Sequence, residues 1–167
     1  DTFVHDRQSA ATTLVSVSTS GVQGDGMSWG TPSISGDGQR VVFQSASTNL
    51  VPGDTNGEHD VFVRDLQAGT TTRVSLGPGA LEGDSWSEFP VISADGRWVV
   101  FDSASPMVAG DDNHEEDVFV YDLQTGTMTR VSVGPGGVQG NGGSFFQSIS
   151  ADGRWVAFVS WAGNLVT

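Results

Sequence analysis

The sequence contains no cysteine and no lysine, and it has no long apolar run. Without cysteine the chain can form no disulfide, no thiolate metal site and no cysteine nucleophile. Seven arginines stand against 20 acidic residues, which gives a formal net charge of −13 at pH 7. Such a chain cannot neutralise a phosphate backbone, so we expect neither nucleic acid nor an anionic membrane surface as a partner. The lack of apolar runs also argues against membrane insertion.

The sequence also lacks helical periodicity, but it contains an internal repeat. No window combines an apolar stripe of helical period with capping residues, so we predict no α-helix of consequence. One block of sequence occurs three times, at Asp1 to Ser16, Asp60 to Ser75 and Asp117 to Ser132. A second block recurs in step with it, at Ile34 to Ser47, Ile92 to Ser105 and Ile149 to Ala162. A fixed period of this size indicates an array of equal supersecondary units.

One repeat contains four short strand signals separated by turns. In the copy that begins near Pro90, the predicted strands are Pro90 to Ser93, Arg97 to Ser103, Asp117 to Leu123 and Thr127 to Val133. The Asp95-Gly96 pair between the first two strands is a hairpin signal. Four antiparallel strands per repeat are typical of a β-propeller blade. The alternative, a β-solenoid, has shorter coils and lacks the two tight hairpins.

The repeated phrases also resemble a known family. S-A-D-G-R-x-V-x-F, followed by D-V-F-V-x-D-L-x-x-G-x-x-x-R-V-S, resembles the TolB-like propeller repeat. The resemblance covers essentially the whole chain and implies an all-β propeller of four-stranded antiparallel blades. It also implies a bacterial periplasmic or secreted location. It says little about function, because blades of this kind carry many roles.

The blades divide the chain as one propeller domain with an open seam. We expect a half blade at 1–18, full blades at 31–76 and 89–133, and a second half blade at 146–162. Three blade equivalents are too few to close a ring, since propellers have four to eight blades. We therefore expect a homo-oligomer, in the simplest case a dimer that closes a six-bladed ring. Each seam blade would combine 147–160 of one chain with 2–16 of the other. The alternative is that the chain is a piece of a longer propeller.

Two acidic loops between the second and third strands carry oxygen-bearing side chains at alternate positions. These residues are Asp54, Asn56, Glu58, Asp60, Asp111, Asn113, Glu115 and Asp117. The spacing resembles the first half of calcium-binding loops, where such side chains converge on one cation. We therefore predict calcium as a structural cofactor that ties each loop to its blade. The alternative is that these residues are ordinary turn formers that keep a long loop solvated.

A catalytic centre is not expected. The segment from Gly26 to Gly30 matches G-x-S-x-G, but it lies between two predicted strands instead of between a strand and a helix. Ser28 is therefore not predicted to be a nucleophile. The three histidines do not occupy equivalent repeat positions, and no spacing suggests a zinc site.

A binding face is expected where the connections between blades reach the central channel. The aromatic residues predicted there are Trp29, Trp86, Phe145 and Phe146. Such rings can anchor a protein partner or stack on sugars, or they can simply pack between blades. We favour an exported, non-catalytic interaction or scaffold module. The alternatives are a lectin-like propeller that binds a glycan and an accessory propeller of a larger hydrolase.

Overall fold

The computed structural model describes all 167 residues and consists of antiparallel β-sheets. Two sheets have four strands each, paired in chain order as the repeat predicts. Blade I contains β3 (Ser28–Ile34), β4 (Arg40–Ser45), β5 (Asp60–Asp65) and β6 (Thr70–Arg73). Blade II contains β9 (Ser87–Ile92), β10 (Trp98–Ser103), β11 (Asp117–Asp122) and β12 (Thr127–Arg130).

Two smaller sheets lie beyond the blades. The N-terminal half sheet pairs β1 (Phe3–His5) with β2 (Thr12–Leu14), and the C-terminal half sheet pairs β13 (Ser144–Ile149) with β14 (Val156–Ser160). A short hairpin joins the blades and comprises β7 (Leu76–Gly77), a 3-10 turn (Pro78–Ala80) and β8 (Leu81–Glu82). A second 3-10 turn covers Pro135–Gly137. The prediction of no substantial helix is confirmed, and no helix is long and apolar enough to cross a membrane.

The repeated Asp-Gly pairs form the first hairpin of blade I, of blade II and of the C-terminal half sheet. In blade II, Asp95 Oδ1 accepts a hydrogen bond from the Ser93 hydroxyl and another, 3.0 Å long, from the Arg97 backbone N–H. The glycine that follows, Gly96, has a φ of +71°, a left-handed conformation that L side chains rarely adopt. The turn chemistry therefore explains why Asp-Gly recurs at this position.

A second repeated pair joins the third and fourth strands. The Ser75 hydroxyl donates to Asp60 Oδ1 and accepts a 3.0 Å hydrogen bond from the backbone N–H of Val61. Ser132 and Asp117 repeat this arrangement in blade II. All four side chains are buried, so each carboxylate and hydroxyl satisfies the other inside the sheet.

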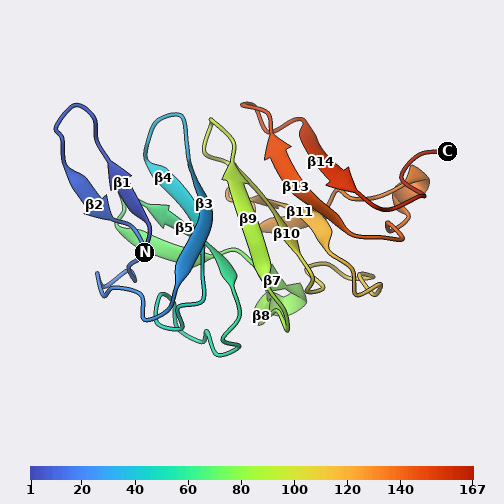
Figure 1. Ribbon diagram of the computed structural model, residues 1–167, viewed down its shortest axis with the longest axis horizontal. Coiled ribbons are helices and arrows are strands. Elements are labelled where there is room, and N and C mark those ends of the chain that lie inside the picture. The colour runs from blue at the N-terminus through green and yellow to red at the C-terminus, as the bar shows by residue number, and fades with distance from the viewer.

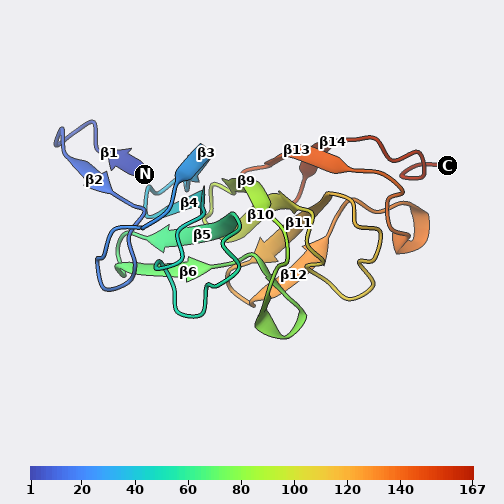
Figure 2. The same ribbon diagram turned by 60° about the horizontal axis from the view of Figure 1, so that its bottom comes forward.

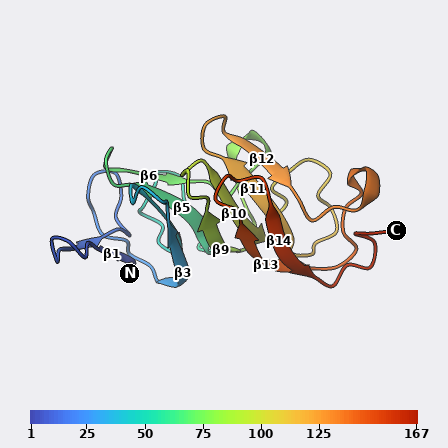
Figure 3. The same ribbon diagram turned by 90° about the horizontal axis from the view of Figure 1, so that it is seen from above.

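The sheets stand side by side in a row, with the two termini at opposite ends (Figure 1). The first strands β3, β9 and β13 line one side of this row, while the outer strands β6 and β12 lie on the other (Figure 2, Figure 3). Strand β9 contacts both β3 and β13, so the first strands form the inner side of the array.

Apolar clusters fill the spaces between successive sheets. The largest lies between the blades and includes Val42 and Val61 of blade I with Val99 and Phe101 of blade II. A second cluster joins the N-terminal half sheet to blade I, and a third joins blade II to the C-terminal half sheet. Each sheet is thus stabilised by packing against its neighbours, which is the mode of cohesion expected of stacked repeats.

Candidate functional site

The most distinctive surface feature is a continuous row of aromatic rings, four of them on the inner strands β3, β9 and β13. We call this set the aromatic row, and in order of contact it consists of His59, Trp29, Phe89, Phe146, Phe145 and Trp161. Successive ring centroids lie 5.3, 6.4, 6.2, 5.0 and 4.8 Å apart, and every pair is edge-to-face. This is the geometry that aromatic pairs prefer.

Much of the aromatic row faces solvent. Trp29 is 44% exposed, Phe146 65% and Trp161 77%. Single exposed apolar side chains are ordinary on protein surfaces, but a contiguous set is typical of a binding surface. The row crosses blade I, blade II and the C-terminal half sheet, so the packing of three sheets is needed to assemble it.

A bulge interrupts each first strand at these rings. The pairing of β9 with β10 shifts register between Val100 and Asp102, and β13 pairs with β14 in the same irregular way. At the bulges Phe89 and Phe146 have φ values of +50° and +57°. A bulky residue in this left-handed region is a conformational outlier that the surrounding structure must hold in place.

Two glutamines from neighbouring sheets hold the Phe89 backbone. Gln44 Oε1 of β4 accepts a 2.8 Å hydrogen bond from the Phe89 N–H. Gln147 Nε2 of β13 donates a 2.7 Å hydrogen bond to the Phe89 carbonyl. Both glutamines are buried, so they satisfy the backbone groups that the bulge removes from the ladder.

The surroundings of the aromatic row are acidic. Glu88 Oε1 lies 2.8 Å from His59 Nδ1, beside Trp29. Asp102 is 5% exposed, and burial, with smaller contributions from the charges of Glu116 and Glu88, raises its pKa to about 7. Glu116 lies near the other end of the row, because a Cβ added to Gly143 would lie 3.8 Å from Glu116 Oε2 and 3.7 Å from Phe145 Cε1.

The structure brings together three of the four residues predicted for the binding face. Trp29, Phe145 and Phe146 belong to the aromatic row, whereas Trp86 is 41% exposed and has no aromatic partner. Sequence reasoning missed His59, Phe89 and Trp161. Phe89 could have been found, because it occupies the same repeat position as Phe146, directly before the last residues of the first strand.

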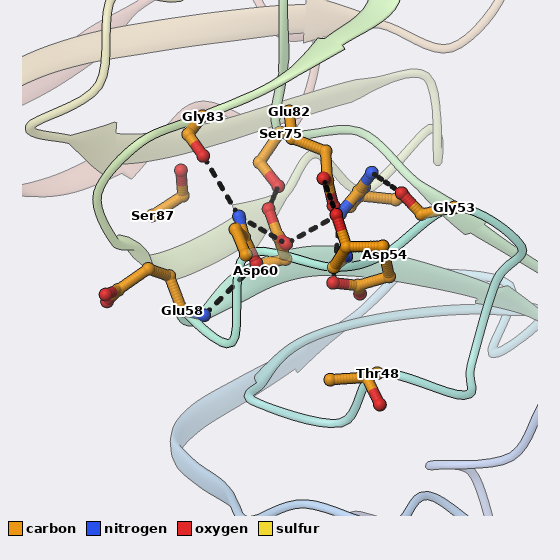
Figure 4. Close-up of polar contacts among 12 residues, drawn as sticks. Thr48, Gly53, Asp54, Glu58, Asp60, Ser75, Glu82, Gly83 and Ser87 are labelled. Atoms are coloured by element: carbon orange, nitrogen blue, oxygen red, sulfur yellow. Dashed lines mark hydrogen bonds and ion pairs between the residues drawn. The ribbon is translucent and has the colours of Figure 1, made fainter.

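The acidic loop of blade I is organised around a buried arginine, Arg73. Figure 4 shows Asp54, Asp60 and Glu82, which surround it. The Arg73 side chain is 6% exposed, and its Nη1 lies 3.2 Å from Asp54, 2.9 Å from Asp60 and 2.9 Å from Glu82. Arg73 Nη2 also donates a 3.4 Å hydrogen bond to the Gly53 carbonyl. One guanidinium therefore supplies the positive charge in the middle of this cluster.

The second acidic loop has the same arrangement. Arg130 Nη1 lies 2.9 Å from Asp111 and 3.2 Å from Asp117, and its Nη2 donates to the Gly110 carbonyl. Desolvation raises the pKa of Asp54 and of Asp111 to about 6, and the neighbouring aspartate adds to the rise in each case. These aspartates therefore have higher pKa values than freely solvated ones, because they are packed together and shielded from water.

This geometry differs from the calcium loops predicted from the sequence. Asn56 and Asn113 donate their amides to the backbone carbonyls of Gly83 and Gly140, and Glu58 and Glu115 are exposed. Figure 4 shows Glu58 pointing away from Asp54 and Asp60. No set of three or more acidic, histidine or cysteine side chains is arranged to hold a metal ion. The predicted ligands do not fit one cation because arginine occupies the centre of each cluster.

Ser28 lies within a strand and has a structural partner. Its hydroxyl donates a 3.0 Å hydrogen bond to the Ser45 hydroxyl, and Ser87 with Ser103 repeats the pair in blade II. The serine of the G-x-S-x-G match is therefore the serine that each repeat pairs with the second strand.

Solved structures show which fold these sheets share. TolB from Acinetobacter baumannii superposes with a TM-score of 0.55 and 20% identity over 96% of this chain and 32% of its own length. Oligogalacturonate lyase in complex with manganese gives a TM-score of 0.59 and 15% identity over 96% of this chain and 41% of that one. The propeller domain of the Trilobed protease from Pyrococcus furiosus gives a TM-score of 0.52 and 16% identity over 80% of this chain and 34% of that one.

These likenesses concern the fold, since all lie below 25% identity. The sequence matches no family model and no curated protein. The chain spans about a third of the length of the TolB structure from A. baumannii. The repeated motif, the four-stranded antiparallel sheets and the superpositions agree, and the chain has the TolB-like β-propeller fold.

Proposed function

We propose that this chain is a non-catalytic β-propeller interaction module that binds a protein or peptide partner on the aromatic row. The observation that carries the proposal is the unbroken contact of six rings across three sheets, with Trp29, Phe146 and Trp161 open to solvent. Rigid aromatic side chains contribute much contact area at a low entropic cost, and they dominate the energetics of protein interfaces.

The charge around the aromatic row favours a cationic partner. Glu88 and Glu116 lie near the rings, and the whole molecule carries a net charge of −13. A lysine or arginine side chain can stack on an aromatic face while its charge meets the carboxylates. We therefore expect the preferred peptides to combine basic and apolar residues.

Selection from a displayed peptide library tests this function. Peptides recovered on the wild-type chain should lose about tenfold or more in affinity for the Phe146→Ala variant. Trp86→Ala is the control, because Trp86 is also exposed, at 41%, but lies outside the aromatic row. Peptides that bind both variants as tightly as the wild type would refute the assignment.

A glycan ligand is the second candidate. Trp29 lies beside the His59–Glu88 pair, so one ring and two polar groups are available to a sugar. A glycan array with the wild type and the Trp29→Ala variant separates the two candidates. Saturable sugar binding that depends on Trp29, without peptide binding, would favour the lectin.

The proposal also covers the oligomeric state of the module, its location and the domains that accompany it. We propose that two copies close one six-bladed ring, and that the protein acts in the periplasm or outside the cell, in line with its repeat motif. An accessory role beside a hydrolase domain is the third candidate, supported by the fold shared with the Trilobed protease propeller. A reading frame that encodes both domains would favour it.

A further inference from the structure

The two half sheets each end where a blade would continue. Strand β14 pairs only with β13, and β1 pairs only with β2, whereas β4 and β10 are paired on both sides. The open edges lie at opposite ends of the row of sheets (Figure 1). Exposed strand edges of this kind are templates for pairing with another chain.

The repeat shows which segment completes each edge. In blade II the second and third strands pair from Trp98 with Asp122 to Ser103 with Asp117. By repeat position β14 corresponds to β10 and β1 corresponds to β11. The same register would pair Trp155 with Asp6 and Ser160 with Asp1.

Exposed apolar groups mark the same surfaces. Phe3 is 56% exposed, while its counterparts Phe62 and Phe119 are completely buried. Each counterpart packs on a phenylalanine of the second strand, with ring centroids 5.7 Å apart for Phe43–Phe62. The equivalent partner of Phe3 is Phe158 of β14, which lies at the far end of the same chain.

Charged groups are also left without their counterparts. In blade II the guanidinium of Arg97 forms two hydrogen bonds with Asp122, at 2.9 and 2.7 Å. Arg154 and Asp6 occupy the equivalent places in the half sheets, and both are exposed. Arg154 already lies over the ring of Trp155 at 4.7 Å, as Arg97 lies over Trp98 at 4.5 Å.

Packing between successive sheets adds a third complementary pair. The Trp98 ring covers Gly153 of the next hairpin so closely that an added Cβ would lie 2.0 Å from its Cδ1. Trp155, the counterpart of Trp98, is 65% exposed. In a closed ring the blade that follows the C-terminal half sheet would be blade I, whose equivalent of Gly153 is Gly38. A Cβ added to Gly38 has nothing within 4 Å.

We propose that the occupant of both edges is a second copy of this chain. In the resulting twofold dimer each seam blade joins β13 and β14 of one copy to β1 and β2 of the other, with an Arg154–Asp6 ion pair and with Trp155 on Gly38. One sequence supplies both complementary halves, so one symmetry operation satisfies both edges at once. The inference rests on the ring closure in the proposed function and adds the residues that form it.

Sedimentation of the wild-type chain gives the first test. The expected mass is twice the chain mass of 17.4 kDa, with dissociation on dilution. Trp155→Ala should weaken dimerisation by about tenfold or more, because tryptophans at interface centres contribute most of the affinity. Trp161→Ala is the control: it is 77% exposed but lies on the aromatic row, and it should dimerise like the wild type.

Charge reversal tests the register of the seam. Arg154→Asp and Asp6→Arg should each weaken self-association by about tenfold or more, because like charges then oppose one another at both seams. Mixing the two variants should restore the dimer, since both seams of the mixed dimer hold opposite charges again. The same reversals at Arg97 and Asp122 serve as the control, because that pair lies within one chain and cannot be restored by mixing.

The outcomes separate the seam from the binding function. A wild-type chain that stays monomeric at all concentrations, an assembly of another mass, or a dimer indifferent to Trp155→Ala would overturn the seam. Binding of library peptides to the aromatic row is measured on the same samples. If dimerisation is lost but peptides still bind, the seam is wrong and the binding function of the aromatic row stands. If the chain forms a seam-dependent dimer that binds no peptide, the binding function is wrong and the seam stands.

Discussion

The buried arginines Arg73 and Arg130 are the residues that shape the acidic loops. Each arginine ends a fourth strand and contacts carboxylates of the loop that precedes the third strand. Each also donates a hydrogen bond to a backbone carbonyl of that loop. The N-terminal copy of the repeat has Leu14 at the corresponding place. The arginine thus occurs in the two repeat copies whose acidic loop is present in this chain.

Removing Arg73 should leave buried carboxylates without their counter-charge. We expect Arg73→Met to lower the free energy of unfolding by about 3–5 kcal/mol, the usual effect of breaking a buried ion pair by removing one partner. Urea unfolding followed by circular dichroism measures this change. Arg7→Met, at an exposed position, should leave stability nearly unchanged. Equal losses in the two variants would contradict a special role for Arg73.

Calcium can be tested with the same variant. If Arg73 supplies the positive charge of the loop, millimolar calcium should leave the melting temperature of the wild type unchanged relative to a chelator. The Arg73→Met variant should be stabilised by calcium, because its carboxylates are then free to bind a cation. A clear rise in the wild-type melting temperature would support the calcium loops predicted from the sequence.

Asp102 should make the protein less stable as the pH rises. Its pKa is about 7 in the folded protein against an ordinary value of 3.8, so between these values the folded state holds a proton that the unfolded state has lost. Stability therefore falls across this window, by on the order of a few kcal/mol. Asp54 and Asp111, with pKa values of about 6, act in the same direction.

Asp102→Asn isolates this effect. The neutral amide cannot ionise, so the variant should be more stable than the wild type at pH 8 and little changed at pH 5, as thermal unfolding at the two pH values would show. Asp37→Asn is a control of opposite sign, because hydrogen bonds from Ser35 and Gln39 lower the pKa of Asp37. A wild type with equal stability at both pH values would contradict the prediction.

At the scale of elements, the hairpin of one sheet docks against the next sheet. Gly153, at the turn between β13 and β14, lies under Trp98 with a φ of +71°. Gly53 has a similar φ of +76° but open space around it. A side chain would cause backbone strain at both positions, because both have a positive φ, but only at Gly153 would it also clash with a neighbour.

Gly153→Ala should therefore destabilise the C-terminal half sheet more than backbone strain alone explains. We expect it to cost about 1–3 kcal/mol more than Gly53→Ala, because the new Cβ forces Trp98 from its place. Hydrogen exchange should show lost protection in β13 and β14 while blade I keeps its protection. A uniform loss over the whole chain would show that the sheets do not unfold as separate units.

At the scale of the molecule, the net charge of −13 opposes the proposed dimer. Two such chains repel one another over a distance that salt shortens, whereas the Arg154–Asp6 contacts act only at short range. Long-range fields act mainly on association rates.

The rate constant of dimer association should therefore rise with ionic strength. Mixing chains that carry donor and acceptor dyes, at low and at physiological salt, measures this rate. Binding of basic peptides to the aromatic row should respond in the opposite way, with slower association at high salt. A dimerisation rate that falls with salt would contradict the prediction.

The local sequence was sufficient for the fold and its register. Asp-Gly turns, β-branched strands and a fixed period predicted four-stranded antiparallel blades, because these signals depend on neighbours close in the chain. The same reasoning placed Trp29, Phe145 and Phe146 on one face. Trp86, predicted for the same face, is exposed but has no aromatic partner, so its place on the binding face stays a prediction.

Only the tertiary structure decided which distant groups meet. Arg73 is separated from Asp54 in the chain, so a count of loop oxygens suggested an ion where the fold places a guanidinium. The aromatic row depends on bulges at Phe89 and Phe146 and on glutamines from the adjoining sheets, and no local pattern encodes that meeting. Sequence determines the unit because its signals are short-range, and packing between units determines the site because its members come from three sheets.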